Sequence, residues 1–209
     1  MIEGINFPTA PWRLEGAAIV ATRTVAIDTA RAFVPRGLRI VPVLPGRTLA
    51  VMGVAGYGPG SALEYHELVV APALTFSRGK IGFWISHIYV DDAASMWAGR
   101  QIWGLPKELA TFEANTSERH LEVSQNGTSL ALIRWNKVSK LTRAPVFMPA
   151  ISSVNSRYAY FKSSGKSRIG SCRAVITTAT TSPFKALGFD QCDRVIWSEQ
   201  LSVNVTAPR

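Results

Sequence analysis

The 209-residue sequence has few charged residues, two cysteines and no long apolar run. Charged residues make up 18% and hydrophobic residues 47%, which is typical of a compact globular protein. Cys172 and Cys192 lie outside any Cys-x-x-Cys pair and are too few for a disulfide framework. No run is long enough to cross a membrane, and the N-terminus lacks the basic region of a secretory signal. We therefore expect a single cytoplasmic domain over residues 1–209 without membrane association.

Acidic residues are absent between Val123 and Phe189, a segment that holds ten lysines and arginines. This segment accounts for the net charge of +9. Such a one-sided charge can attract anions, including carboxylates, phosphates and nucleic acid, but a solvated surface explains it equally well. Residues 157–162 interleave aromatic and basic side chains, as single-stranded nucleic-acid sites do. Because no recognised nucleic-acid-binding module surrounds them, we do not expect a nucleic-acid partner.

Apolar runs separated by turn residues predict a mainly β (α+β) protein with small helices. Pro72 lies inside one of the runs and indicates a sheet edge or a bulge there. The expected strands cover residues 17–22, 47–55, 65–76, 81–90, 175–180 and 201–206.

Turn and capping residues add one hairpin and two short helices. Asn126-Gly127 favours the tight turn of a β-hairpin between strands at 120–123 and 129–135. Asp28 is a plausible N-cap for a helix over 28–33. Asp91-Asp92 are expected to cap a second helix that ends at Ala98.

The segment that most clearly suggests a function is Gly99-Arg100-Gln101-Ile102-Trp103-Gly104-Leu105-Pro106-Lys107. Lys107 follows a proline, and its neighbours are mostly apolar. Desolvation disfavours the charged form of an amine, and a neutral lysine is a nucleophile that forms a Schiff base with a carbonyl group. Lys107 is therefore the first candidate for a catalytic residue.

This segment resembles the G-R-x-x-x-G-x-P-K signature of the acetoacetate decarboxylase family, which carries the Schiff-base lysine. Tyr65-His66-Glu67 is similar to the family's Y-x-E motif, and the resemblance extends in order from about Phe7 to Trp135. It implies an acetoacetate decarboxylase-like β barrel with small helices. It further implies a homo-oligomer that acts on a small-molecule carbonyl substrate without a metal or organic cofactor.

The resemblance also implies roles for individual residues. Lys107 would be the nucleophile, and Glu67 would position the substrate and handle protons. Tyr65 and Trp103 would contribute to substrate binding in the same pocket.

The chain departs from the family pattern at three positions. Where the family has a second lysine, this chain has Glu108, which would face away from Lys107 if the segment is extended. The family's second pocket glutamate would fall near Met52. Its carboxylate-binding arginine would fall near residues 16–18, and Arg13 is the nearest arginine. We therefore expect a more apolar pocket, to which Met52 and Arg13 contribute, and acetoacetate itself is a doubtful substrate.

Three functions remain open from the sequence. The first is a Schiff-base lyase that decarboxylates a β-keto acid through a lysine iminium. The second is aldolase, dehydratase or cyclase chemistry on the same scaffold, because an iminium supports these reactions too. The third is a non-catalytic barrel that binds a small ligand. His66, His87 and His120 do not have metal-ligand spacing, so no metal site is predicted.

Overall fold

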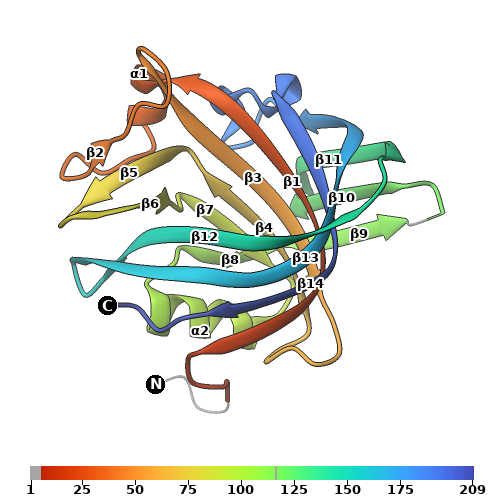
Figure 1. The fold of residues 1–209 in the computed structure, drawn as a ribbon, viewed down its shortest axis with the longest axis horizontal. Helices are drawn as coiled ribbons and strands as arrows, with labels where there is room; N and C mark the ends of the chain where they lie inside the picture. The colour runs from red at the N-terminus through yellow and green to blue at the C-terminus, as the bar shows by residue number, and fades with distance from the viewer. Residues whose placement is uncertain (1–5, 116) are drawn as a thin grey trace.

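The computed structural model describes residues 6–115 and 117–209, and most of them lie in β-strands (Figure 1). The mainly β character and the small helices are thus confirmed. None of the described helices is long and apolar enough to span a membrane. The helical elements are α1 (Ile27–Arg31), α2 (Ala93–Trp103) and the 3-10 turns η1 (Lys185–Leu187) and η2 (Phe189–Gln191). The strands are β1 (Trp12–Ala26), β2 (Arg39–Ile40), β3 (Arg47–Tyr57), β4 (Tyr65–Ala71), β5 (Ala73–Ser77), β6 (Lys80–Trp84), β7 (His87–Val90), β8 (Lys107–Leu109), β9 (Thr111–Asn115), β10 (His120–Gln125), β11 (Thr128–Val138), β12 (Thr142–Val154), β13 (Arg157–Thr178) and β14 (Arg194–Val205).

The strands form one curved sheet in the order β2-β5-β6-β12-β13-β14-β1-β3-β4-β7-β8. Strand β11 joins this sheet through β13, and β10 and β9 follow it. Two pairs, β6–β12 and β7–β8, are parallel. The ends of the path, β2 and β8, do not pair with each other in the described part of the chain. Closure into a barrel is therefore not confirmed and stays a prediction.

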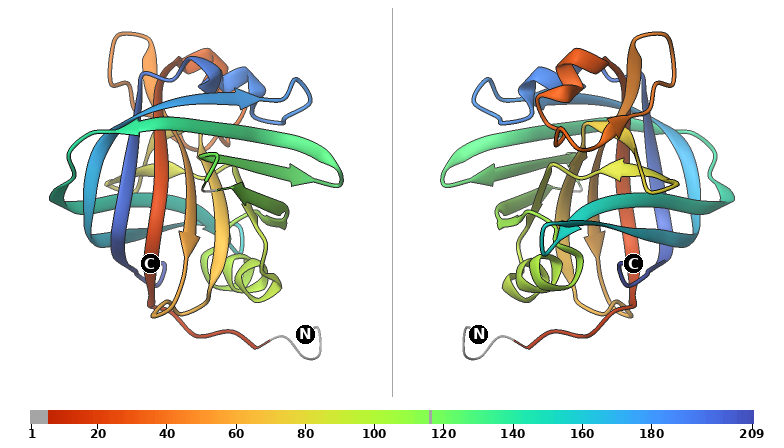
Figure 2. Two further views of the ribbon diagram at one scale, coloured as in Figure 1. Left: turned by 90° about the vertical axis from the view of Figure 1, so that its right-hand side faces the viewer. Right: turned by 90° about the vertical axis from the view of Figure 1, so that its left-hand side faces the viewer.

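The helices lie at opposite ends of the curved sheet. Helix α1 packs near η1 at one end, and α2 lies at the other (Figures 1 and 2). Helix α2 also packs against β7, β8 and β12. These contacts place the segment that follows α2, and with it Lys107, against the sheet.

Two hydrophobic clusters occupy the two faces of the sheet. Because successive side chains of a strand point to opposite faces, β4 contributes to both clusters. Leu68 and Val70 belong to the larger cluster, whereas Tyr65 and Val69 face the smaller one. Helix α2 buries its apolar side chains in the smaller cluster. The residues of β4 that face α2 are therefore the odd-numbered ones.

Two of the predicted strands are each divided in the structure. The predicted strand 65–76 is two strands, because Pro72 separates β4 from β5. The predicted strand 81–90 is interrupted at residues 85–86. This break lets β6 pair with β5 and β12 while β7 pairs with β4. The remaining predicted strands coincide with or overlap β1, β3, β13 and β14.

The helix predictions were partly wrong. No side chain caps α1, and Asp28 lies in its first turn instead of at the N-cap. Asp92 is the N-cap of α2, as predicted, but the helix continues past Ala98 to Trp103. In the segment from Gly99 to Lys107, residues 99–103 are therefore helical.

The predicted hairpin is confirmed. Strands β10 and β11 pair across Asn126-Gly127, and both turn residues have positive φ, 50° and 74°. The long strands β12 and β13 lie within the segment from Val123 to Phe189 that lacks acidic residues, and the sequence did not predict them clearly.

One partly exposed carboxylate links the end of β13 to the 3-10 turns. Asp190 accepts hydrogen bonds from the backbone N–H and the hydroxyl of Thr178, at 2.9 and 2.7 Å, and from Lys185 Nζ at 2.9 Å. Burial alone would raise the pKa of Asp190, but these donors lower it from 3.8 to about 2. Asp190 therefore stabilises the fold above pH 3.8, and this contribution disappears as the pH falls towards 2.

We expect Asp190→Asn to lower the free energy of unfolding at pH 7 by about 0.5–1.5 kcal/mol, because charge-assisted hydrogen bonds at a partly exposed site are lost. The difference from wild type should shrink as the pH falls from 4 towards 2. Urea denaturation at several pH values measures both effects. Glu64→Gln, at an exposed carboxylate, should change stability little. A difference that does not depend on pH would contradict this assignment.

Candidate active site

The end of helix α2 determines where Lys107 begins its strand. Gly104 ends the helix with a φ of 61°, in the left-handed region that favours glycine. The backbone N–H of Leu105 then donates to the carbonyl oxygen of Gly99 at 3.0 Å. A side chain at position 104 would also collide with the backbone of Ser153. This turn directs the chain back along α2 and into β8.

The glycine and the arginine of the motif both contact Lys107. The Lys107 side chain crosses the helix at Gly99, where an added Cβ would lie 2.8 Å from Lys107 Cε. Arg100 Nε donates a hydrogen bond to the carbonyl oxygen of Lys107 at 2.7 Å. These two contacts hold the Lys107 side chain against helix α2.

The amine of Lys107 is buried among polar partners. Lys107 is 3% exposed. Its Nζ lies 2.8 Å from Glu67 Oε2 and 2.9 Å from Ser95 Oγ, to which it donates. It also lies 4.8 Å from the centre of the Tyr65 ring, within range of a cation–π contact. Glu67 is likewise largely buried, with 13% of its side chain exposed.

Strand β4, helix α2 and strand β8, which holds Lys107, bring these partners together. Glu67 and Tyr65 are odd-numbered residues of β4 and therefore face α2. Ser95 lies in the first turn of α2, where its backbone N–H donates to the Asp92 side chain at 2.6 Å. The capping bond thus fixes the turn that presents the Ser95 hydroxyl to Lys107.

Two tyrosines lie beside the Glu67 carboxylate. Tyr65 donates its hydroxyl to Glu67 Oε2 at 3.4 Å, and the Tyr57 ring packs on that of Tyr65 at 5.0 Å. Burial, followed by the charge of Glu67, raises the pKa of both phenols well above the usual value of 10. Both tyrosines therefore stay protonated at neutral pH and are available as hydrogen-bond donors.

Glu108 points away from the amine of Lys107. It is exposed, and its Oε2 accepts from Gln125 Nε2 at 2.8 Å. The segment is the extended strand β8, so adjacent side chains face opposite sides, as the sequence analysis anticipated.

The structure brings Lys107, Glu67 and Tyr65 together but places two other predicted residues elsewhere. Met52 pairs with Val70 and lies in the cluster on the opposite face of the sheet. Arg13 is exposed and pairs with Glu15. Neither reaches the group around Lys107.

Trp103 lies in the same cluster as Tyr65, at the C-terminal end of α2. Its ring packs edge-on against Trp12 at 5.0 Å, and its Nε1 donates to the carbonyl oxygen of Thr206 at 2.9 Å. These contacts make Trp103 a wall of the region around α2. Its role in substrate binding stays a prediction.

The sequence analysis missed Ser95 and Tyr57. Ser95 follows Asp92 by three residues, so a capping pattern marks its backbone but gives no sign of its contact with Lys107. Nothing in the local sequence distinguishes Tyr57 from a strand-end aromatic residue. The described residues include no group of three or more His, Cys, Asp or Glu that could hold a metal ion.

The structure is thus that of a mostly β protein with a buried lysine–carboxylate pair between its sheet and helix α2. The family model for acetoacetate decarboxylase matches residues 4–187, and the chain belongs to this family.

Known proteins of several functions share this family's sequence or fold. The protein NEOXANTHIN-DEFICIENT 1 of Oryza sativa subsp. japonica is 33% identical over 125 residues, which cover 59% of this chain and 41% of that protein. The match thus spans less than half the length of that relative. Acetoacetate decarboxylase from Legionella pneumophila has a similar structure, with a TM-score of 0.73 at 15% identity, over 97% of this chain and 86% of that one. The enduracididine biosynthesis enzyme MppR, complexed with pyruvate, has a TM-score of 0.68 at 17% identity, over 99% and 92%.

The ion pair can be tested through stability, independently of any reaction. Removing one partner of a buried pair leaves an uncompensated charge, so Glu67→Leu and Lys107→Met should each cost about 3–5 kcal/mol of unfolding free energy. The double variant should recover most of this loss, because both charges are gone. Chemical denaturation of the four proteins gives the coupling energy. Additive losses would show that the two groups do not interact.

Proposed function

We propose that this chain catalyses a reaction of a ketone or keto acid through a Schiff base on Lys107, with decarboxylation of a β-keto acid as the first candidate. The observation that carries the proposal is the buried Lys107 amine, 2.8 Å from the Glu67 carboxylate. A nucleophile with a base within hydrogen-bond reach is the arrangement that covalent catalysis requires. Membership of the acetoacetate decarboxylase family supports it.

The first half of the reaction forms the iminium. Glu67 takes a proton from the Lys107 ammonium, and the free amine attacks the carbonyl carbon of the substrate. The resulting carbinolamine loses its hydroxyl group as water, with a proton returned by Glu67. The product is an iminium, and Glu67 is again a carboxylate.

The second half breaks the carbon–carbon bond. The bonding electrons move towards the iminium nitrogen as carbon dioxide leaves, and an enamine remains. Glu67 delivers a proton, taken up from solvent, to the enamine carbon. Water then hydrolyses the new iminium, which releases the ketone and restores the Lys107 ammonium. Ser95 and Tyr65 hold the amine and the carboxylate in place throughout.

A second candidate is condensation or dehydration chemistry on the same iminium. Arg13, the predicted partner for a substrate carboxylate, is paired with Glu15 on the surface. The relative NEOXANTHIN-DEFICIENT 1 and the fold neighbour MppR are named for other functions than acetoacetate decarboxylation. A neutral ketone or aldehyde therefore fits the site as well as a β-keto acid does. A non-catalytic ligand-binding role is the remaining alternative.

A cytoplasmic homo-oligomer stays part of this proposal. It rests on the family resemblance and on composition.

Borohydride trapping tests the Schiff base directly. We expect a panel of ketones and β-keto acids to give a reduced adduct on Lys107, located by intact mass and peptide mapping. Lys107→Ala should give no adduct, whereas Lys140→Ala, at an exposed lysine, should label like the wild type. Absence of an adduct across the panel and across several pH values would leave the ligand-binding role. The carbonyl compounds that label, and any carbon dioxide released, distinguish the two reaction types.

Glu67→Gln tests the proton-transfer role. The amide keeps the size of the side chain but cannot accept the proton, so turnover should fall about 10²–10⁴-fold. The measurement is the rate of carbon dioxide release or product formation with whichever substrate labels Lys107. Glu64→Gln, three residues earlier and exposed, should keep the wild-type rate. An unchanged rate in Glu67→Gln would assign proton transfer to another group.

A further inference from the structure

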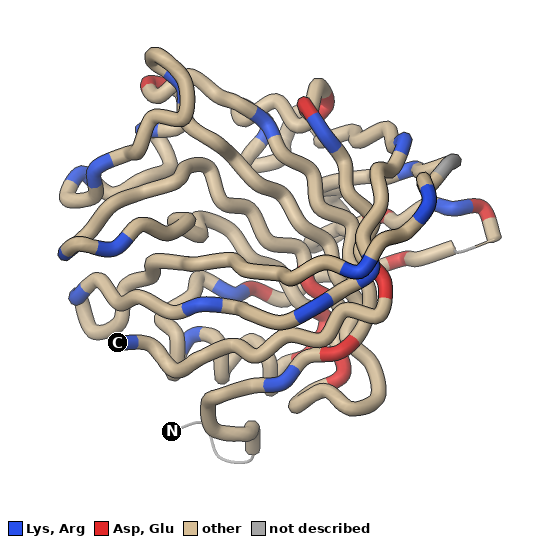
Figure 3. The backbone as a smooth tube through the Cα atoms, viewed as in Figure 1, with Lys and Arg blue, Asp and Glu red and all other residues tan. Residues whose placement is uncertain are grey.

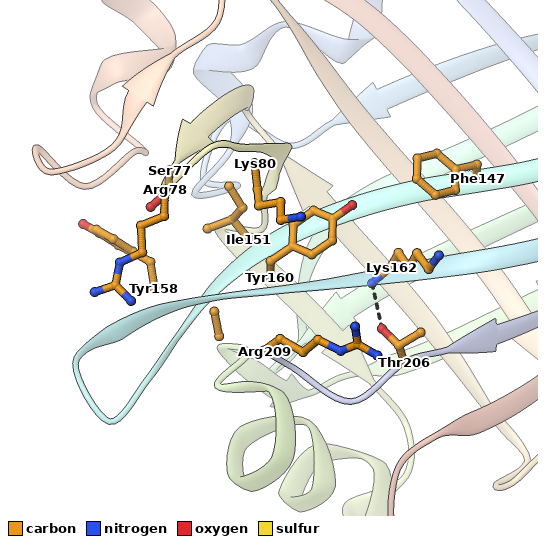
Figure 4. Close-up of a pocket in the computed structure, with 11 residues that line it drawn as sticks. Ser77, Arg78, Lys80, Phe147, Ile151, Tyr158, Tyr160, Lys162, Thr206 and Arg209 are labelled. Atoms are coloured by element: carbon orange, nitrogen blue, oxygen red, sulfur yellow. Dashed lines mark hydrogen bonds between the residues drawn. The ribbon is translucent and has the colours of Figure 1, made fainter.

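Four basic side chains lie away from Lys107, around a cavity beside β12 and β13 (Figure 4). Arg78 and Lys80 come from the β5–β6 hairpin, Lys162 comes from β13, and Arg209 lies at the rim. The cavity has a volume of about 500 Å³, which is within the usual range for small-molecule sites.

No acidic side chain lines this cavity. Within residues 6–115 and 117–209, none of its four basic side chains forms an ion pair with a carboxylate. The trace of the chain shows basic residues along β12 and β13 (Figure 3). Several cations with no acidic side chain among them create a positive potential that attracts anions. The cavity is therefore suited to an anionic group.

Aromatic rings lie between the cations. Lys80 Nζ is 5.7 Å from the centre of the Tyr160 ring, and Lys162 Nζ is 6.0 Å from that of Phe147. The Phe147 side chain is 62% exposed, which is unusual for a phenylalanine. Figure 4 shows the Tyr160 ring beside the end of Lys80, with Lys162 further along β13. An apolar surface next to the charges favours an organic anion over an inorganic ion.

The interleaved segment 157–162 is divided between the two faces of β13. Tyr158, Tyr160 and Lys162 line the cavity. Phe161 points the other way, is 4% exposed and belongs to the cluster around α2. Of the three aromatic residues in this segment, only Tyr158 and Tyr160 are therefore available to a ligand in the cavity. The bounded cavity fits a small ligand.

We propose that this cavity binds a small organic anion, a flat ring that carries a phosphate group, at a site separate from Lys107. The phosphate would lie between Lys80 and Lys162, and the ring would pack on Tyr160 beside them. Charge-assisted hydrogen bonds from the two lysines would supply most of the affinity for the phosphate. This proposal does not depend on the reaction at Lys107.

Calorimetric titration with phenyl phosphate tests the proposal. We expect binding that is about tenfold tighter than that of inorganic phosphate, because the ring adds apolar contact. The double variant Lys80→Ala/Lys162→Ala should weaken it by about tenfold or more. The matched control Lys140→Ala/Arg143→Ala removes the same charge from exposed positions outside the cavity and should change it less than about twofold. The double variant Glu67→Leu/Lys107→Met, which removes both charges of the buried pair, should bind like the wild type.

Three results would overturn the proposal. Equal weakening in both double variants would mean that only the general positive charge attracts the probe. Loss of binding in the Glu67→Leu/Lys107→Met double variant, with its fold intact by circular dichroism, would place the probe at the candidate active site. A uridine oligomer that binds more tightly than phenyl phosphate, and whose affinity falls in the control variant, would indicate an extended nucleic-acid surface.

Discussion

The ion pair between Lys107 and Glu67 is the interaction on which the rest of the site depends. Burying both charges carries a large desolvation penalty, which is offset only when the remaining hydrogen-bonding capacity is used. Ser95 supplies a further partner for the amine, and Tyr65 one for the carboxylate. The neighbouring structure follows from this need: Asp92 fixes the turn that holds Ser95, and a glycine at position 99 leaves room for the lysine stem.

The sequence predicted the central pair of the candidate site better than the residues around it. Lys107 and Glu67 stand in two short motifs that resemble those of the acetoacetate decarboxylase family, so both could be named without coordinates. Met52 could not be placed, because its face of the sheet depends on its register opposite Val70. A shift of one residue in that register would turn Met52 towards the other cluster. Ser95 lies twelve residues before Lys107 in the sequence, and no local pattern predicts the hydrogen bond between their side chains.

The fold was predicted well where apolar runs end at strong turn signals and poorly where polar residues alternate with apolar ones. The hairpin at Asn126-Gly127 is an example of the first case. Strands β12 and β13 are examples of the second: basic side chains recur along β13, while Phe161 is buried in the smaller cluster and Cys172 in the larger one. Pro72 marked a break correctly, but the sequence could not show that β4 and β5 separate to pair with different strands.

The candidate active site and the cavity beside β12 and β13 differ in their charge. The buried pair around Lys107 contains one cation and one carboxylate, and its other polar neighbours are neutral hydroxyl groups. A substrate carboxylate entering this group would meet the like charge of Glu67, and the arginine expected to offset it lies on the surface. In the proposed mechanism this balance is kept, because the iminium nitrogen carries the positive charge that the ammonium carried and Glu67 is again a carboxylate. The proposed reaction therefore favours substrates whose negative charge is absent or is lost in the reaction, and decarboxylation is a reaction of the second kind.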